Sequence, residues 1–259
     1  MKGHPVTRYT DLTYEELREL LPRADAAFIP LGCTEQQGPH LPTDFDTWMI
    51  TRLCGEIADT LEREHGQSVA VLPTLPFGPT PEHAGFGFGY INLRRSTHEA
   101  VVEDVLKSLA AQGFRTLIVW RGCGQHNLGA VADRFNASHE RCAAYQPVID
   151  YGAICDSAFG RPVPGGHADS FATSIRLHLD RDAVRMDKVR EPTLQPFEWG
   201  DDMDFAAISD TGVIGDPTQA SAEAGARIWE MCVREGVRLT RLLLEGRSDQ
   251  VRQTWHFLP

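Results

Sequence analysis

Hydrophobic residues along the chain fall into two kinds of pattern, short apolar runs and longer amphipathic stretches. The apolar runs, each typical of a buried strand, are residues 26–31, 69–73, 114–120 and 143–149. The stretches with apolar residues at helical spacing are residues 48–65, 96–112, 128–139 and 218–244, with shorter helices predicted near Thr13 and Phe171. Strands that alternate with helices predict an α/β protein of three layers (α/β/α), in which helices cover both faces of a mainly parallel sheet.

Composition narrows the class of protein further. The chain has 259 residues, of which 42% are hydrophobic, which suits one sizeable core, and we predict a single domain over residues 1–259. A formal net charge of -11 disfavours binding to nucleic acid or to an anionic membrane. No window approaches the ~20 apolar residues of a membrane span, and the six cysteines are scattered without a CxxC pair. We therefore expect a soluble, cytoplasmic protein with reduced thiols and no nucleic-acid or membrane partner.

Ligands of parallel α/β sheets bind beyond the carboxyl ends of the strands, which directs attention to the loops that follow the predicted strands. The first of these loops, residues 32–47, carries Glu35 and Asp46 among glycines and prolines. Carboxylate oxygens suit a hard or borderline divalent metal, so the two side chains are candidates to converge on one ion. The alternative is a loop stiffened by glycine and proline, in which the carboxylates cap turns or the following helix.

The second loop, residues 120–127, places Cys123 and His126 in a glycine-punctuated turn after a strand. A thiolate and an imidazole are good ligands for zinc or iron, and the thiolate is also a nucleophile. In the alternative, Cys123 is a small apolar filler and His126 begins a helix.

A third loop carries His167 after two glycines and just ahead of a predicted helix, a placement that suits a general acid or base. The alternative is a helix N-terminus capped by Asp169 or Ser170. Residues 191–216 have little periodicity, and we expect them to form a long loop over the site.

The three loops and residues 211–217 together resemble the creatininase family, the creatinine amidohydrolases and their relatives. The first loop is similar to the family run G-S-x-E-Q-H-G-P-H-L-P-x-x-x-D-T, and the second to N-G-H-x-x-N with one residue added. The third is similar to H-A-G-E-x-E-T-S, and residues 211–217 to G-V-x-G-D-P. The pair Glu82 and His83 resembles a family E-H pair near the substrate pocket or a subunit contact.

The resemblance implies a creatininase-like fold, a homo-oligomer (a hexamer), and metal-dependent hydrolysis of amide-like C–N bonds in a small-molecule substrate, often in rings or formamides. It also implies two metals bridged by an aspartate, with a histidine that moves protons. By position, Glu35 matches the carboxylate of the first metal, Asp46 the bridging carboxylate, and His167 the proton-shuttling histidine.

Most departures from the family pattern fall on the residues that bind the second metal in the family. Gln37 replaces its histidine, and Gln125 and Ser170 hold the two places from which its carboxylate is drawn, so we predict that this site is absent. At the first metal, Cys123 replaces the histidine, and His126 is a further candidate ligand if the added residue re-aims the turn. Three ligands and an open position suit one catalytic zinc ion, with iron or manganese as alternatives.

Two hypotheses for function follow. The first is a single-metal hydrolase of a non-peptide amide C–N bond, in which Gln37 orients the substrate and Arg121 attracts an anionic group on it; a salt bridge is the alternative role for Arg121. The second is a metal-free member of the family, either a biosynthetic enzyme that acts through Cys123 and His167 or a binding protein.

Overall fold

The computed structural model describes residues 8–200 and 203–253 of the chain. Within these ranges it contains one sheet of four parallel strands in the order β2-β1-β3-β4. The strands are β1 (Ala26–Leu31), β2 (Val69–Val71), β3 (Thr116–Arg121) and β4 (Ala143–Tyr145). The predicted parallel α/β sheet is therefore confirmed, although its edge strands are shorter than the sequence suggests.

Both edge strands end early for local reasons. The strand β2 stops two residues before Pro73, which has no N–H to donate to a neighbouring strand. After β4, the chain turns away from β3, and the N–H of Val148 donates to the carbonyl of Arg252 instead.

The longer helices are α2 (Phe45–His65), α3 (Arg95–Gln112) and α8 (Ala222–Leu244). The shorter ones are α1 (Tyr14–Leu20), α4 (Gly129–Ser138), α5 (Tyr151–Phe159), α6 (Ser170–Leu179) and α7 (Phe205–Ile208). The helix α5 was not expected from the sequence, because it is only nine residues long and includes Gly152. No helix in the described part of the chain has the length and apolar character needed to cross a bilayer.

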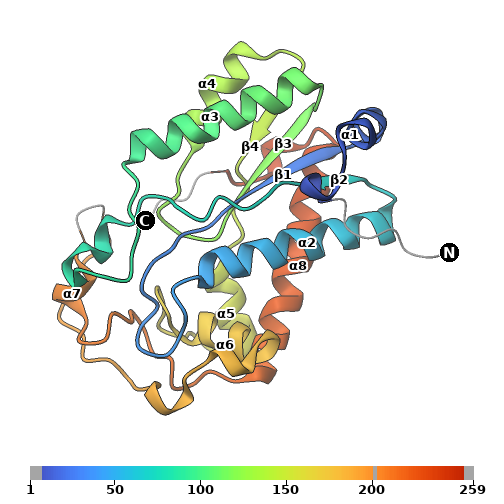
Figure 1. The fold of residues 1–259 in the computed structure, drawn as a ribbon. Coiled ribbons are helices and arrows are strands. Elements are labelled where there is room, and N and C mark those ends of the chain that lie inside the picture. Colours follow the sequence, from blue (N-terminus) through green and yellow to red (C-terminus); the bar gives the residue numbers. More distant parts are fainter. Residues whose placement is uncertain (1–7, 201–202, 254–259) are drawn as a thin grey trace.

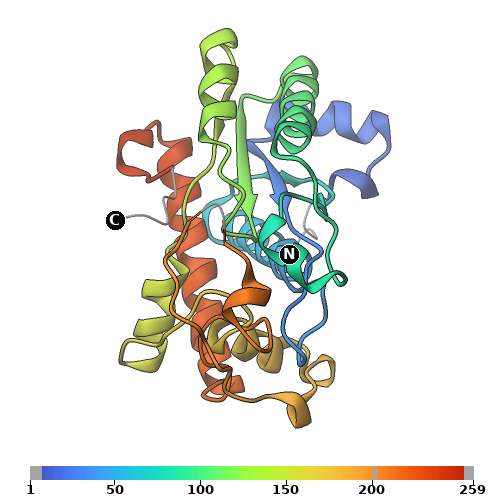
Figure 2. The same ribbon diagram turned by 90° about the vertical axis from the view of Figure 1, so that its left-hand side faces the viewer.

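The helices cover both faces of the sheet and complete the predicted three-layer arrangement (Figures 1 and 2). On one face, Phe28 and Trp120 pack into a core shared with α2, α6 and α8. On the other face, Ile29 and Val119 pack against α1, α3 and α4. Adjacent residues of β1 point to opposite cores, which explains why this central strand is apolar throughout.

A close approach between two segments sets up the carboxyl edge of the sheet. A Cβ atom on Gly122, directly after β3, would lie only 2.6 Å from the backbone oxygen of Asp46 in the first turn of α2. Only glycine allows this contact, which brings the next residue, Cys123, toward the start of α2.

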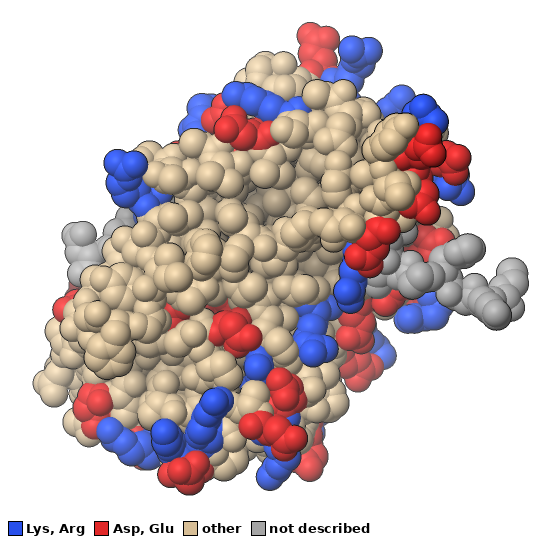
Figure 3. All heavy atoms as spheres, in the orientation of Figure 1, with Lys and Arg blue, Asp and Glu red and all other residues tan. Residues whose placement is uncertain are grey.

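The surface carries its charges in mixed groups. Figure 3 shows Lys and Arg side chains among Asp and Glu side chains around the edge of one face, with a broad uncharged area across its middle. The negative net charge is therefore not gathered into a single acidic patch on this face.

Candidate active site

A cavity of about 460 Å³ lies at the carboxyl edge of the sheet. Polar side chains line part of it: Glu35, Gln37, Asp46, Glu82, Arg121, Cys123 and His167. Its apolar wall includes Phe45, Met49, Tyr151, Phe171, Trp199 and Phe205. Trp199 and Phe205 belong to the aperiodic segment 191–216, of which residues 201–202 lie outside the described residues.

The buried carboxyl groups of Glu35 and Asp46 both contact the side-chain amide of Gln37. Nε2 of Gln37 donates hydrogen bonds to Asp46 (3.0 Å) and to Glu35 (3.4 Å). Burial, together with the charge of Glu82, raises the pKa of Glu35 to about 8. Burial and the neighbouring Glu35 also raise the pKa of Asp46 well above its usual range. A nearby cation would favour the ionised form of both groups.

Two thiols join the carboxyl groups. Cys33, Glu35, Asp46 and Cys123 are all buried, and each offers one potential ligand atom within 4.8 Å of the other three. Burial raises the pKa of Cys33. A hydrogen bond with Cys33 works in the opposite direction at Cys123, yet burial and the nearby carboxyl groups raise its pKa to about 12. Thiolate and carboxylate donors at this separation fit a single zinc or iron ion.

His126 lies on the other side of the thiols. Its Nε2 is 3.2 Å from Sγ of Cys33, and its ring packs at 4.6 Å against that of His98. Among the described residues, the possible ligand group that contains His126 consists of Cys33, Cys123 and His126, without either carboxylate. The ring fits there because Gly78, on the facing loop, has no Cβ, which would lie 2.0 Å from Nε2. The structure thus brings Glu35, Asp46 and Cys123 together and leaves His126 beside Cys33.

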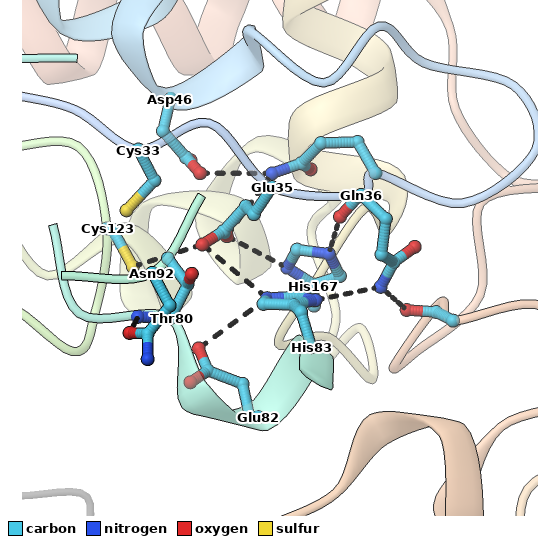
Figure 4. Close-up of polar contacts among 12 residues, drawn as sticks. Cys33, Glu35, Gln36, Asp46, Thr80, Glu82, His83, Asn92, Cys123 and His167 are labelled. Carbon is cyan, nitrogen blue, oxygen red and sulfur yellow. Dashed lines mark hydrogen bonds and ion pairs between the residues drawn. The ribbon is translucent and has the colours of Figure 1, made fainter. Parts of the chain in front are cut away.

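Gln36 determines which ring nitrogen of the buried His83 carries the hydrogen in the neutral ring. The side-chain oxygen of Gln36 accepts from the N–H of Gly38, so its nitrogen must donate, both to the carbonyl of Gly212 and to Nδ1 of His83 at 3.1 Å. Nδ1 of His83 is therefore an acceptor, and Nε2 carries the hydrogen. This Nε2 lies 3.5 Å from both Glu35 and Glu82 (Figure 4).

The same reasoning applies to His167. Its Nε2 lies 2.6 Å from the backbone oxygen of Gln36, which can only accept, so Nε2 donates and Nδ1 is left without a hydrogen in the neutral ring. Nδ1 is 3.6 Å from Glu35. Burial and the neighbouring His83 hold the pKa of His167 well below its usual range. His167 therefore presents an unprotonated nitrogen, which can accept a proton, to the carboxyl group of Glu35.

The loop of His167 is held from both sides. Its backbone exchanges two hydrogen bonds with Ile214, and the next residue, Ala168, has a φ of 51°, a left-handed conformation that costs energy outside glycine. Asp169 caps α6 and also accepts from the N–H of Gly166 at 2.7 Å. The helix cap and the histidine site, which were alternatives in the sequence, coexist in the structure.

Arg121 and the replaced second-metal positions complete the site. Arg121 ends β3, donates to the carbonyl of Gly124 at 3.0 Å, and has a pKa lowered by burial to about 10. Gln125 lines the cavity, and the hydroxyl of Ser170 donates to the carbonyl of Asp216. Both are neutral, which suits one metal ion better than two.

Sequence reasoning missed Cys33 as a site residue and left Glu82 either near the substrate pocket or at a subunit contact. Glu82 is buried in the cavity wall, and burial raises its pKa to about 7. The available signal for Cys33 was its position directly after the strand, at the place where the family pattern has serine.

A three-layer parallel α/β fold with buried carboxyl, thiol and imidazole groups at the carboxyl edge of its sheet is typical of an enzyme with its active site at that edge. The chain belongs to the creatininase family: the family's sequence model, described as Creatinine amidohydrolase, matches residues 10–240. The resemblance seen in the sequence is confirmed, and the chain is a hydrolase.

Two curated relatives illustrate the range of the family. The chain is 32% identical over 222 residues to the Mycofactocin precursor peptide peptidase of Mycobacterium tuberculosis (strain ATCC 25618 / H37Rv), with 81% of this chain and 82% of the relative covered. It is 26% identical over 265 residues to the Creatinine amidohydrolase of Pseudomonas putida, with 94% of this chain and 95% of the relative covered.

Solved structures agree on the fold. A candidate creatinine amidohydrolase from Bacteroides fragilis NCTC 9343 matches with a TM-score of 0.81 at 21% identity, covering 95% of this chain and 98% of its own. A creatininase described as a manganese form matches with a TM-score of 0.77 at 22% identity, covering 98% of this chain and 100% of its own.

Proposed function

We propose that this chain hydrolyses an amide C–N bond of a small molecule, of the cyclic amide or formamide type, with one divalent metal ion. The observation that carries the proposal is the buried grouping of Glu35, Asp46 and Cys123, with His167 Nδ1 3.6 Å from Glu35. Zinc is the ion we favour because a thiolate ligand selects it over magnesium; iron and manganese are the alternatives.

A bound divalent ion would supply two things, a lowered pKa for water and polarisation of the substrate carbonyl. The remaining chemistry falls to side chains of the chain itself. Nδ1 of His167 takes up the proton that water loses and delivers it to the leaving nitrogen. The Nε2–H bond to Gln36 holds the ring in that orientation, and Phe205, whose ring is centred 5.2 Å from that of His167, shields it from solvent.

The supporting groups hold the acidic side chains in place. Gln37 occupies one oxygen of Asp46 with a hydrogen bond and leaves the other free to bind a cation. Nε2 of His83 lies 3.5 Å from both Glu35 and Glu82, close enough to offset part of their charge if the ring is protonated. Gln37 also lines the cavity, where its amide oxygen can accept a hydrogen bond from the substrate.

The cavity wall limits the kind of substrate. Arg121 remains cationic at neutral pH and would attract an anionic group on the substrate. The aromatic side chains of Tyr151, Phe171 and Trp199 would contact an apolar body. A cavity of about 460 Å³ also admits larger amides, so a peptide amide bond is the second candidate, as in the relative described as a peptidase.

A metal-free activity through Cys123 and His167 is less well supported. A nucleophilic cysteine must be a thiolate, and burial among carboxyl groups raises the pKa of Cys123 to about 12. The same carboxyl groups that suppress the free thiolate would favour a cation beside it.

Metal analysis tests the proposal directly. Protein purified without chelator should contain about one zinc, iron or manganese ion per chain, and Glu35→Gln and Asp46→Asn should each lower both metal content and amidase activity at least about tenfold. Glu64→Gln, at an exposed position of α2, is the matched control and should change neither. Wild-type protein that takes up no divalent metal, even when supplied with excess zinc, would rule out the mechanism.

We also propose a cytoplasmic homo-oligomer, a hexamer by analogy with the family. The cytoplasmic location is supported by the six cysteines, all of which are unpaired and buried. Oligomerisation is supported by two exposed hydrophobic side chains in one loop, Phe88 (79% exposed) and Ile91 (45%). Light scattering of the wild type and of Phe88→Ser, which should dissociate more readily, tests the assembly.

A further inference from the structure

We propose that Cys33 is a metal ligand, so that Cys33 and Cys123 together make this a two-thiolate, two-carboxylate site that selects zinc-like ions over manganese and magnesium. This inference rests on the metal site proposed above and adds a ligand and a selectivity to it. The family pattern has serine at the position of Cys33 and histidine at that of Cys123, so both thiols are departures from the pattern.

The first argument is convergence. Cys33 follows β1 and Cys123 follows β3, neighbouring parallel strands whose carboxyl ends meet at one edge of the sheet. The two sulfur atoms and one oxygen each of Glu35 and Asp46 lie within 4.8 Å of one another in a buried pocket (Figure 4). Four donors at such separations would fit zinc, which takes four ligands and can expand to five when a water or substrate enters. Sulfur donors favour soft or borderline ions.

The second argument comes from the groups behind the ligands. Metal-binding side chains are usually held by hydrogen bonds from a surrounding shell of donors. Here Gln37 donates to Asp46 at 3.0 Å and to Glu35 at 3.4 Å, while Nε2 of His83 lies 3.5 Å from Glu35 without forming a hydrogen bond. Nε2 of His126 lies 3.2 Å from Sγ of Cys33 and can donate to it once the sulfur is a thiolate. Three of the four ligands thus have an N–H donor directed at them, which offsets part of their negative charge.

This arrangement gives His126 a different role from the one expected from sequence. Its Nε2 contacts Cys33 and is outside the group that contains the carboxylates, so it is a positioning residue for the thiolate. Binding of the ion requires both thiols to lose their protons to solvent, since a coordinated cysteine is a thiolate.

The test uses metal affinity and spectroscopy rather than catalysis. We would titrate the metal-free full-length protein with zinc, manganese and cobalt(II), and compare wild type with Cys33→Ser, Cys123→Ser and the double variant. Cys142→Ala, at a buried thiol outside the site, is the control for loss of a cysteine. Serine is the residue of the family pattern at position 33, so this variant should fold; circular dichroism of each metal-free protein checks that it does.

We expect the cobalt form of the wild type to show a sulfur-to-cobalt charge-transfer band that each single variant reduces to about half and the double variant abolishes. Cys33→Ser should weaken zinc binding at least about tenfold while changing manganese binding much less. Cys142→Ala should match the wild type, and His126→Gln should weaken zinc binding while retaining the band.

Three outcomes would overturn the inference, and they separate it from the proposed function. If Cys33→Ser keeps the full band and zinc affinity while Cys123→Ser loses them, Cys33 is not a ligand and the single-metal hydrolase stands. If His126→Gln removes binding and Cys33→Ser does not, the imidazole occupies the fourth position. If the folded wild type binds none of the three ions, both proposals fail.

Discussion

Nδ1 of His167 lies 3.6 Å from a carboxylate oxygen of Glu35, while Nε2 of the same ring donates to the backbone carbonyl of Gln36. The carbonyl decides which nitrogen carries the hydrogen, so the basic nitrogen is the one that faces the acidic cluster. The group that we propose for proton transfer is thereby oriented by a backbone carbonyl, which a side-chain rearrangement cannot easily displace.

The first prediction concerns this ring. His167→Asn should lower kcat by about 10²–10⁴-fold because the proton-transfer nitrogen is lost. Zinc content should stay at the wild-type level, since the proposed ligands are untouched. Steady-state kinetics and elemental analysis of the same preparation measure both. His178→Gln, at an exposed position of α6, should behave as wild type; a parallel loss of metal in His167→Asn would instead make this histidine a ligand.

The second prediction concerns Gln37, whose amide serves both carboxyl groups. Gln37→Met keeps the length of the side chain and removes its donors. The free energy of unfolding of the metal-free protein should fall by about 1–3 kcal/mol, the cost of leaving a buried acceptor unsatisfied. Urea denaturation measures this, with the exposed substitution Gln195→Met as control. An unchanged unfolding midpoint would mean that solvent or another donor replaces the amide.

The sequence predicted those helices and strands whose hydrophobic residues follow a clear pattern within the element itself. The central strands were found because residues buried on both faces give unbroken apolar runs, as in β1. The helix α5 was missed because nine residues that include Gly152 carry little periodicity; the side chain of Asp150, which caps it, was its best signal.

The sequence predicted which loops form the candidate site, but not how the individual side chains are arranged in it. The rule that ligands bind at the carboxyl ends of parallel strands directed attention to the segments that hold Glu35, Asp46 and Cys123. It could not show that Cys33 points into the same space, because a cysteine after a strand is indistinguishable in sequence from a small core residue. Nor could it separate His126 from the carboxylates, since that depends on the packing of Gly78 against the ring.

A third prediction tests the contact that brings the two loops together. Gly122→Ala would place a methyl group 2.6 Å from the backbone oxygen of Asp46, so we expect a loss of about 1–3 kcal/mol in unfolding free energy and weaker zinc binding. Gly55→Ala is the matched control, because it lies within α2 and its added Cβ meets no atom within 4 Å. In a helix interior this change should stabilise by about 0.5–1 kcal/mol. Equal effects of the two substitutions would contradict the role of the contact.

The last prediction is a pH dependence of stability that arises beside the site. His98 and His126 stack in the interior, and Nε2 of His98 and Nδ1 of His126 have no hydrogen-bond partner within the described residues. Burial lowers the pKa of His98 to about 4 and that of His126 well below its usual range. At these two histidines the unfolded chain therefore binds protons more readily than the folded chain. The stability that they contribute is fully present above about pH 6.5 and declines as the pH falls toward 4. For His98 alone, the stability that its neutral form contributes should fall by about 2 kcal/mol between pH 7 and pH 5. Urea denaturation of the metal-free protein at the two pH values measures this loss.

Two variants separate His98 from the other titrating groups. His98→Phe keeps a ring against His126 but cannot be protonated, so its stability should decline less than that of the wild type. The exposed substitution His178→Phe should decline like the wild type. If His98→Phe loses as much stability as the wild type over this range, the protonation of other groups controls the acid sensitivity of the fold.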